Sequence, residues 1–221
     1  MKIIYEDNHL LVVEKPINVP VQEDSSGDKD LLTLLKEDIK VRYDKPGNVY
    51  LGLVHRLDRP VGGAMVFAKT SKAASRLADT LRKQEMQREY VAVLRGVPTK
   101  KSAQLVNYLW KDGAKNKVHV VPAKDKRGKK AILTYETQKV NGNSALVKVQ
   151  LQTGRSHQIR VQFAAIGCPL YGDQKYGQHV NRVGEQIALW STMIAFPHPT
   201  TKEWLTFTSS PPNEQPWQQF F

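Results

Sequence analysis

Residues 52–70, GLVHRLDRPVGGAMVFAKT, place a polar turn between two apolar runs. Leu53 and Val54 stand before the turn, and residues 64–68 follow it, so the pattern predicts two short strands. The turn holds four polar or charged side chains ahead of a proline and a Gly-Gly pair: His55, Arg56, Asp58 and Arg59. A hairpin turn with solvated charges is one interpretation. A carboxylate held in place for chemistry is the other.

Asp58 is the acidic residue that this stretch offers for chemistry. It is the only acid between residues 51 and 78, and it lies between Arg56 and Arg59. Neighbouring cations favour the ionised form of a carboxylate. An ionised carboxylate in a fixed position can act as a nucleophile or as a general base. Asp58 is therefore the candidate catalytic residue.

The composition is that of a globular protein in a reducing compartment. The chain has 221 residues, of which 40% are hydrophobic and 24% are charged. Its one cysteine, Cys168, can form no intrachain disulfide, which favours a cytoplasmic location. The first residues do not resemble a signal peptide, and no apolar run is long enough to cross a bilayer. We expect a cytoplasmic protein without a membrane partner.

Positive charge is concentrated in one segment. The net charge is +12, and residues 100–130 alone hold ten basic and two acidic side chains. A basic surface attracts polyanions, most commonly nucleic acid. A lysine-rich loop with no partner is the alternative. The side chains that we expect to contact an RNA backbone are Lys111, Lys115, Lys117, Lys126, Arg127, Lys129 and Lys130.

The order of apolar patterns predicts an α+β fold. Strands are expected near residues 2–6, 10–14, 88–97, 104–110, 117–122, 131–140 and 144–153, with closing strands within 186–199 and 203–212. Helices are expected over 30–43, with Asp30 as N-cap, and from Thr70 or Ser71 onward. Strands adjacent in sequence favour a largely antiparallel, mixed sheet with flanking helices. We expect one domain, residues 1–221.

A second polar cluster stands at residues 151–162, LQTGRSHQIRVQ. The pattern predicts that Arg155 enters a helix whose N-terminus, together with Arg155 and Arg160, favours a bound anion. An exposed polar helix start is the alternative. Tyr90, in the predicted strand REYVAVLRG at 88–96, is either a core residue or a platform for stacking a base.

The sequence offers no support for a metal or a nucleotide cofactor. Its six histidines include no pair spaced i, i+4 on a predicted helix, and a single cysteine excludes a CxxC motif. Neither GxGxxG nor GxxxxGK[ST] occurs. We expect no cofactor and no metal.

Taken together, these motifs resemble the RluA-type family of RNA pseudouridine synthases. HRLDRPVGG at 55–63 is similar to the family's catalytic motif, REYVAVLRG to its tyrosine-bearing strand, and LQTGRSHQIRVQFAAIGCPLYGDQKYG at 151–177 to its Thr-Gly-Arg helix and the segment after it. DNHLLVVEKP at 7–16 resembles its N-terminal strands, although the family's Lys-Pro-x-Gly reads KPIN here. The resemblance is to the short form, without an S4-type RNA-binding domain.

The resemblance implies a role for four residues. Asp58 would be the catalytic carboxylate, Arg155 would pair with it, Tyr90 would stack on the target uracil, and Arg56 would help to expel the uridine from the RNA helix. The implied reaction converts uridine to pseudouridine in structured RNA, ribosomal or transfer, without a cofactor. We expect RNA and not DNA as the partner, and a monomeric protein.

Two other functions remain open at this point. One is a non-catalytic RNA-binding protein that retains the synthase fold. The other is a nucleoside glycosidase, which would need two well-spaced carboxylates where this sequence places one well. Loss of Asp58, Tyr90 or Arg155 would have favoured the non-catalytic protein, and all three are present.

Overall fold

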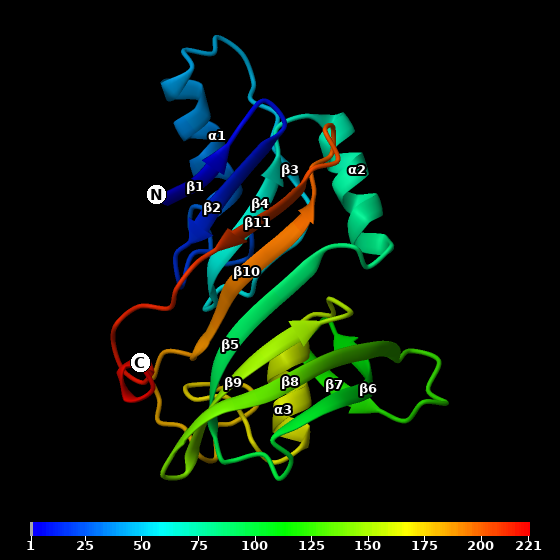
Figure 1. Cartoon of the computed structure of the whole chain (residues 1–221), viewed down its shortest axis with the longest axis vertical. Helices are drawn as coiled ribbons and strands as arrows, with labels where there is room; N and C mark the ends of the chain where they lie inside the picture. Colours follow the sequence, from blue (N-terminus) through cyan, green and yellow to red (C-terminus); the bar gives the residue numbers. More distant parts are fainter. Residues whose placement is uncertain (1) are drawn as a thin grey trace. The chain divides into compact units, whose positions relative to one another are not determined.

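A computed structural model of the chain describes residues 2–221 and divides into two compact units (Figure 1). Unit 1 comprises residues 2–87 and 191–210, and unit 2 comprises residues 88–190 and 211–221. The division falls within two strands, β5 (Gln87–Arg95) and β10 (Leu189–Pro197), so both strands contribute residues to each unit.

The sheet of unit 1 is built from strands at both ends of the sequence. Its strands are β1 (Lys2–Glu6), β2 (Leu10–Lys15), β3 (Gly52–Leu53), β4 (Gly62–Ala68), most of β10, and β11 (Trp204–Thr208). They follow the order β1-β2-β4-β10, with β3 beside β4 and β11 beside β10. The pairs β1–β2, β2–β4, β3–β4 and β10–β11 are antiparallel. All seven residues of β4 are buried, which makes β4 the centre of this unit.

Two capped helices belong to unit 1. Helix α1 (Leu31–Arg42) begins after Asp30, whose carboxylate accepts from the Thr33 N–H at 3.0 Å. Helix α2 (Ser71–Arg82) begins after Thr70, whose hydroxyl accepts from the Ala73 N–H at 3.1 Å. Asp30 is the cap that the sequence predicts, and Thr70 is one of the two residues predicted to begin the second helix.

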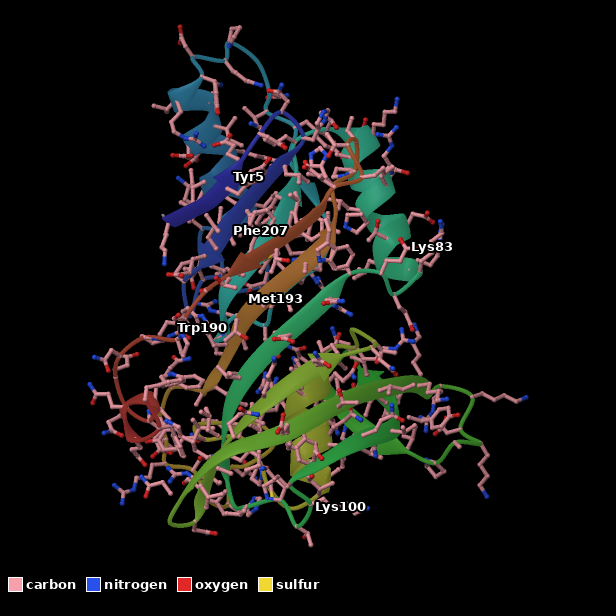
Figure 2. All side chains as sticks on the ribbon, in the orientation of Figure 1. Tyr5, Lys83, Lys100, Trp190, Met193 and Phe207 are labelled. Atoms are coloured by element: carbon pink, nitrogen blue, oxygen red, sulfur yellow. The ribbon has the colours of Figure 1, made fainter. Side chains whose placement is uncertain are left out.

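The core of unit 1 joins α2 to the sheet. Leu77 and Ala73 of α2 pack with Val66 of β4 in one buried cluster. Near the sheet edge, the rings of Tyr5 and Phe207 lie with centroids 5.1 Å apart (Figure 2). Residues from both ends of the chain therefore share one core.

The sheet of unit 2 follows the order β5-β9-β8-β6-β7. Its other strands are β6 (Ser102–Asp112), β7 (Lys117–Val121), β8 (Lys129–Asn141) and β9 (Ser144–Leu151), and every neighbouring pair is antiparallel. Helix α3 (Gln158–Ala165) packs on one face through Val161, which lies in a cluster with Leu109, Val118 and Ala131 (Figure 1). A 3-10 turn, η1 (Trp217–Gln219), follows near the end of the chain.

The predicted α+β class and the largely antiparallel pairing are confirmed, and the predicted start of the helix after residue 154 is wrong. Helix α3 begins at Gln158 and not at Arg155, because the Gln158 side chain accepts from the Arg155 N–H at 2.9 Å and from the Thr153 hydroxyl at 2.8 Å. These bonds hold residues 153–157 as a turn. His157, at the N-cap, has a left-handed backbone with φ of 51°.

The expectation of a single domain stays a prediction.

In residues 2–221, no helix is both long enough and apolar enough to cross a membrane.

Candidate active site

Asp58 lies in the loop between β3 and β4 of unit 1. It is half-buried, and its carbonyl accepts from the Val61 N–H at 2.9 Å, which closes a tight turn. On its other side, His55 and Leu57 are buried, and the Val66 N–H donates to Nε2 of His55 at 3.2 Å. The turn is thus attached to β4 before and after Asp58.

The Gly-Gly pair allows a close approach of two strands. Gly63 has a φ of +116°, a conformation that residues with a side chain rarely adopt. A Cβ at this position would lie 2.3 Å from the carbonyl oxygen of Ser191 on β10. Glycine at 63 is therefore required for the packing of β4, the strand that follows the Asp58 turn.

A buried lysine, which the sequence analysis did not select, holds the same turn. Lys15, the last residue of β2, has 0% of its surface exposed. Its Nζ donates to the carbonyl oxygens of Pro16 at 2.9 Å, Arg59 at 3.0 Å and Val61 at 2.7 Å. The last two carbonyls follow Asp58 closely along the chain. The ammonium group therefore ties the end of β2 to the turn that carries the candidate catalytic residue.

Burial lowers the pKa of Lys15 from its ordinary 10.5 to about 7. The charge of Asp58 acts in the opposite direction and raises this pKa, while the charge of Arg59 lowers it. An ion in the protein interior loses its hydration, and only a nearby opposite charge or hydrogen bonds offset that loss. Asp58 thus stabilises the charged form of Lys15.

The two arginines of the motif differ in their surroundings. Arg59 forms an ion pair with Asp28 and donates to the Ser26 hydroxyl at 2.8 Å, so it fastens the preceding loop. Arg56 is exposed and donates to the Gln22 side chain at 3.1 Å. Arg56 is therefore the arginine whose guanidinium is more accessible to a ligand.

Tyr90 lies on β5 in unit 2 and is 5% exposed. It is the register partner of Val149 on β9, and Val149 is the partner of Tyr135 on β8. The ring of Tyr135 meets that of Phe163 on α3, with centroids 5.3 Å apart. Since register partners share a face, Tyr90 lies on the α3 side of the sheet. The ring is both part of the buried layer and a candidate platform.

Arg155 lies in the exposed turn before α3. Its Nε donates to the Lys130 carbonyl at 3.0 Å. The turn is fastened to β8 because the Ile132 N–H donates to the Thr153 hydroxyl at 2.8 Å. The sequence predicts an anion site at the first turn of a helix. In the structure, Arg155 instead lies in a Thr-Gly-Arg turn that precedes helix α3 and is hydrogen-bonded to β8.

A buried ion pair that the sequence analysis did not identify anchors α3. Arg160 donates to both carboxylate oxygens of Asp173, at 2.8 and 2.9 Å. Burial by itself raises the pKa of Asp173, but the hydrogen bonds and charge of Arg160, with the N–H groups of Lys175 and Tyr176, hold it below its ordinary value. Tyr176, in turn, lies with its hydroxyl 2.6 Å from Nδ1 of His157. The helix start and the segment after the helix are thus joined.

A basic cleft of about 350 Å³ lies beside this turn in unit 2. Its lining includes four cationic residues and no acidic one, so it is suited to an anion: Lys111, Arg127, Lys129 and Arg155. Three of the seven residues that we expect to contact an RNA backbone meet here. Of the others, Lys115 and Lys117 lie at the β6–β7 turn, Lys126 in the loop before β8, and Lys130 on β8.

The predicted site residues are therefore distributed over both units. Asp58 and Arg56 belong to unit 1, whereas Tyr90, Arg155 and the lysine-rich segment belong to unit 2. Within residues 2–221, no group of three or more His, Cys, Asp or Glu side chains is placed to hold a metal ion.

Comparison with known proteins identifies the family. The family model described as RNA pseudouridylate synthase matches residues 9–165, most of the chain and all of the Asp58 and Arg155 turns. The chain belongs to the RNA pseudouridylate synthase family. The resemblance read from the motifs is thereby confirmed.

Individual relatives agree with this family. Ribosomal large subunit pseudouridine synthase C of Buchnera aphidicola is 31% identical over 90% of this chain and 63% of its own length. Ribosomal large subunit pseudouridine synthase D of Haemophilus influenzae is 31% identical over 97% of this chain and 68% of its own. The chain thus spans about two thirds of the length of these relatives.

The fold also has solved counterparts. The human RNA pseudouridylate synthase domain containing 4 superposes with a TM-score of 0.80 over 96% of this chain and 88% of that one, at 23% identity. At this identity the likeness establishes the fold alone.

Proposed function

We propose that this protein is an isomerase that converts uridine to pseudouridine in RNA, with Asp58 as the catalytic carboxylate. The observation that carries the proposal is the Asp58 turn, which buried Lys15 holds through two hydrogen bonds within the family's catalytic motif. Transfer of an ammonium group from water into a protein interior costs on the order of several kcal/mol. A turn with no role beyond structure rarely needs such a group.

The reaction breaks the bond between N1 of uracil and C1′ of ribose and then joins C5 to C1′. C5 gives up its proton and N1 gains one, so no group is added or lost and no cofactor is required. Asp58 supplies the ionised carboxylate for this exchange. In our proposal Tyr90 stacks on the uracil, Arg155 pairs with Asp58, and Arg56 helps to expel the uridine from the RNA helix.

Extraction of the base from its stack costs a few kcal/mol, of the size known for base-flipping enzymes. Phosphate contacts and stacking in the pocket offset this cost. We assign the phosphate contacts to the seven basic residues named in the sequence analysis, three of which line the basic cleft.

For the substrate we propose ribosomal RNA first, because the relatives' names refer to the large ribosomal subunit. Transfer RNA is the second candidate. The same proposal includes action as a monomer in the cytoplasm, on RNA and not on DNA.

The test is to map pseudouridine in ribosomal and transfer RNA from cells with the gene, without it, and with an Asp58→Asn copy. We expect at least one uridine to be modified only in cells that carry the parent gene. If every pseudouridine persists without the gene, the proposed activity is wrong. If Asp58→Asn restores the modification, the activity stands and the role of Asp58 is wrong.

A further inference from the structure

Arg88 is a largely buried arginine that lacks a counter-charge. It is 8% exposed, and its Nε is buried with no hydrogen-bond partner. Within residues 2–221, no ion pair compensates its guanidinium. Buried polar atoms without a hydrogen-bond partner are few in folded proteins, and each one calls for an explanation. The fold and the motifs already described leave this side chain unexplained.

The position of Arg88 connects it to the candidate site. It lies two residues before Tyr90 on β5, and the two side chains share a face because strand residues alternate. Both are buried, whereas Glu89 between them is less so. Arg88 is therefore on the α3 side of the sheet, beside the proposed stacking residue.

The guanidinium of Arg88 reaches the Thr-Gly-Arg turn. A Cβ built on Gly154 would lie 2.5 Å from Nη1 of Arg88, so a larger residue at 154 would collide with the guanidinium. Gly154 also lines the basic cleft, together with Arg155 and Lys129. Glycine at 154 thus leaves room for Arg88 next to a cleft whose lining has no acidic residue.

We propose, on the basis of the isomerase function above, that Arg88 binds a phosphate group of the RNA backbone at the Thr-Gly-Arg turn. A phosphodiester supplies the missing negative charge and accepts from the planar guanidinium. Lys129 lines the same cleft as Gly154 and supplies a second cation. This phosphate contact sets the register of the RNA along the cleft, so that one nucleotide is presented to Tyr90.

The proposal predicts that affinity and stability change in opposite directions. Arg88→Met removes the charge and keeps an unbranched side chain of similar reach. Because the removed cation has no partner in the free protein, we expect the melting temperature to hold or rise. RNA affinity should fall about tenfold, which corresponds to removal of one charge-assisted hydrogen bond.

Arg95→Gln is the matched control. It lies on the same strand, on the opposite face, and removes the same charge, but Arg95 pairs with Glu185 at 2.8 Å and donates to Asn181 at 3.1 Å. We expect this control to lower the melting temperature and to leave RNA affinity near that of the parent.

Binding should be measured with unmodified large-subunit ribosomal RNA transcribed in vitro, in an Asp58→Asn background, which we expect to perform no chemistry. Affinity decreases as salt increases, and the magnitude of the slope of log affinity against log salt should be smaller by about 0.7–0.9 in Arg88→Met than in the parent. Arg88→Lys should keep the slope. Gly154→Ala should weaken binding in the parent and have little further effect in Arg88→Met, since both act on one guanidinium.

An unchanged affinity and slope in Arg88→Met would overturn the proposal, as would a loss of affinity without any change in slope. A fall in melting temperature with binding per folded molecule preserved would show that Arg88 is structural. None of these results depends on catalysis. Failure of the parent protein to make pseudouridine would instead refute the proposed function and leave the phosphate contact testable.

Discussion

At the scale of single residues, the ammonium group of Lys15 donates to three carbonyl oxygens, two of them in the Asp58 turn. Nothing local in the sequence predicts this contact, because Arg59 and Val61 lie 44 and 46 residues away. The same holds for Arg88, whose lack of a counter-charge emerges only when β5 is placed beside the Thr-Gly-Arg turn. Motif resemblance identified Asp58 but not the lysine that holds its turn.

Lys15→Met should weaken the fold at neutral pH by leaving three carbonyl oxygens without their donor, at about 1–3 kcal/mol for each buried group that stays unsatisfied. The pH dependence gives a sharper readout. With its pKa lowered to about 7, Lys15 releases its proton in the folded protein well before it does so in the unfolded chain, near 10.5. Between these values the unfolded chain binds more protons, so this group makes the unfolding free energy rise with pH.

Urea unfolding at pH 6, 7, 8 and 9 should therefore show a steeper rise in the parent than in Lys15→Met. The difference should be at most about 1.4 kcal/mol per pH unit, the value for one proton. Equal pH dependence in the two proteins would show that Lys15 titrates normally.

Tyr90 requires variants that respect its burial, since a 5% exposed ring also contributes to packing. Tyr90→Phe keeps the ring, and Tyr90→Leu keeps apolar volume without a stacking surface. Stacking on a base is worth ~1–3 kcal/mol. We expect the leucine variant to lose at least tenfold in turnover per folded molecule, and the phenylalanine variant to keep RNA affinity. Similar activity in parent and leucine variant would identify Tyr90 as a core residue only.

At the scale of elements, the sequence predicted those parts that depend on local chemistry. The N-cap Asp30 was predicted, and the start of α2 was predicted to within one residue at Thr70 or Ser71, because the capping bond joins neighbours three residues apart. The start of α3 was not, because Gln158 also donates to the Ile132 carbonyl on β8, a tertiary contact at 3.0 Å. Arg155 therefore precedes the helix instead of entering it.

The basic segment between β6 and β8 is expected to contact RNA phosphates. Neutralising Lys126, Arg127, Lys129 and Lys130 to glutamine should weaken binding and reduce the salt slope by about 0.7–0.9 for each phosphate that the variant no longer binds. Replacing Lys29, Lys36, Lys40 and Lys45 of unit 1 is the matched control for net charge. Equal effects of the two quadruple variants would mean that only overall charge matters.

At the scale of the whole molecule, the chain passes from one compact unit to the other inside β5, after Gln87, and inside β10, after Trp190. The division therefore falls within strands and not within loops. We therefore predict that residues 1–221 form one cooperative domain. Urea unfolding followed by far-ultraviolet circular dichroism and by tryptophan fluorescence should give coincident transitions. Two separated transitions would show two independent domains.

The Asp58→Asn variant tests whether Asp58 is the catalytic carboxylate. Asparagine keeps nearly the same shape but has no negative charge, so it can act neither as nucleophile nor as base. The measurement is pseudouridine formed in a ribosomal RNA transcript by the purified variant, together with its melting temperature and RNA affinity. We expect a folded protein that binds RNA at least as tightly as the parent and forms no detectable pseudouridine. Pseudouridine formation at a rate close to the parent's would contradict this expectation.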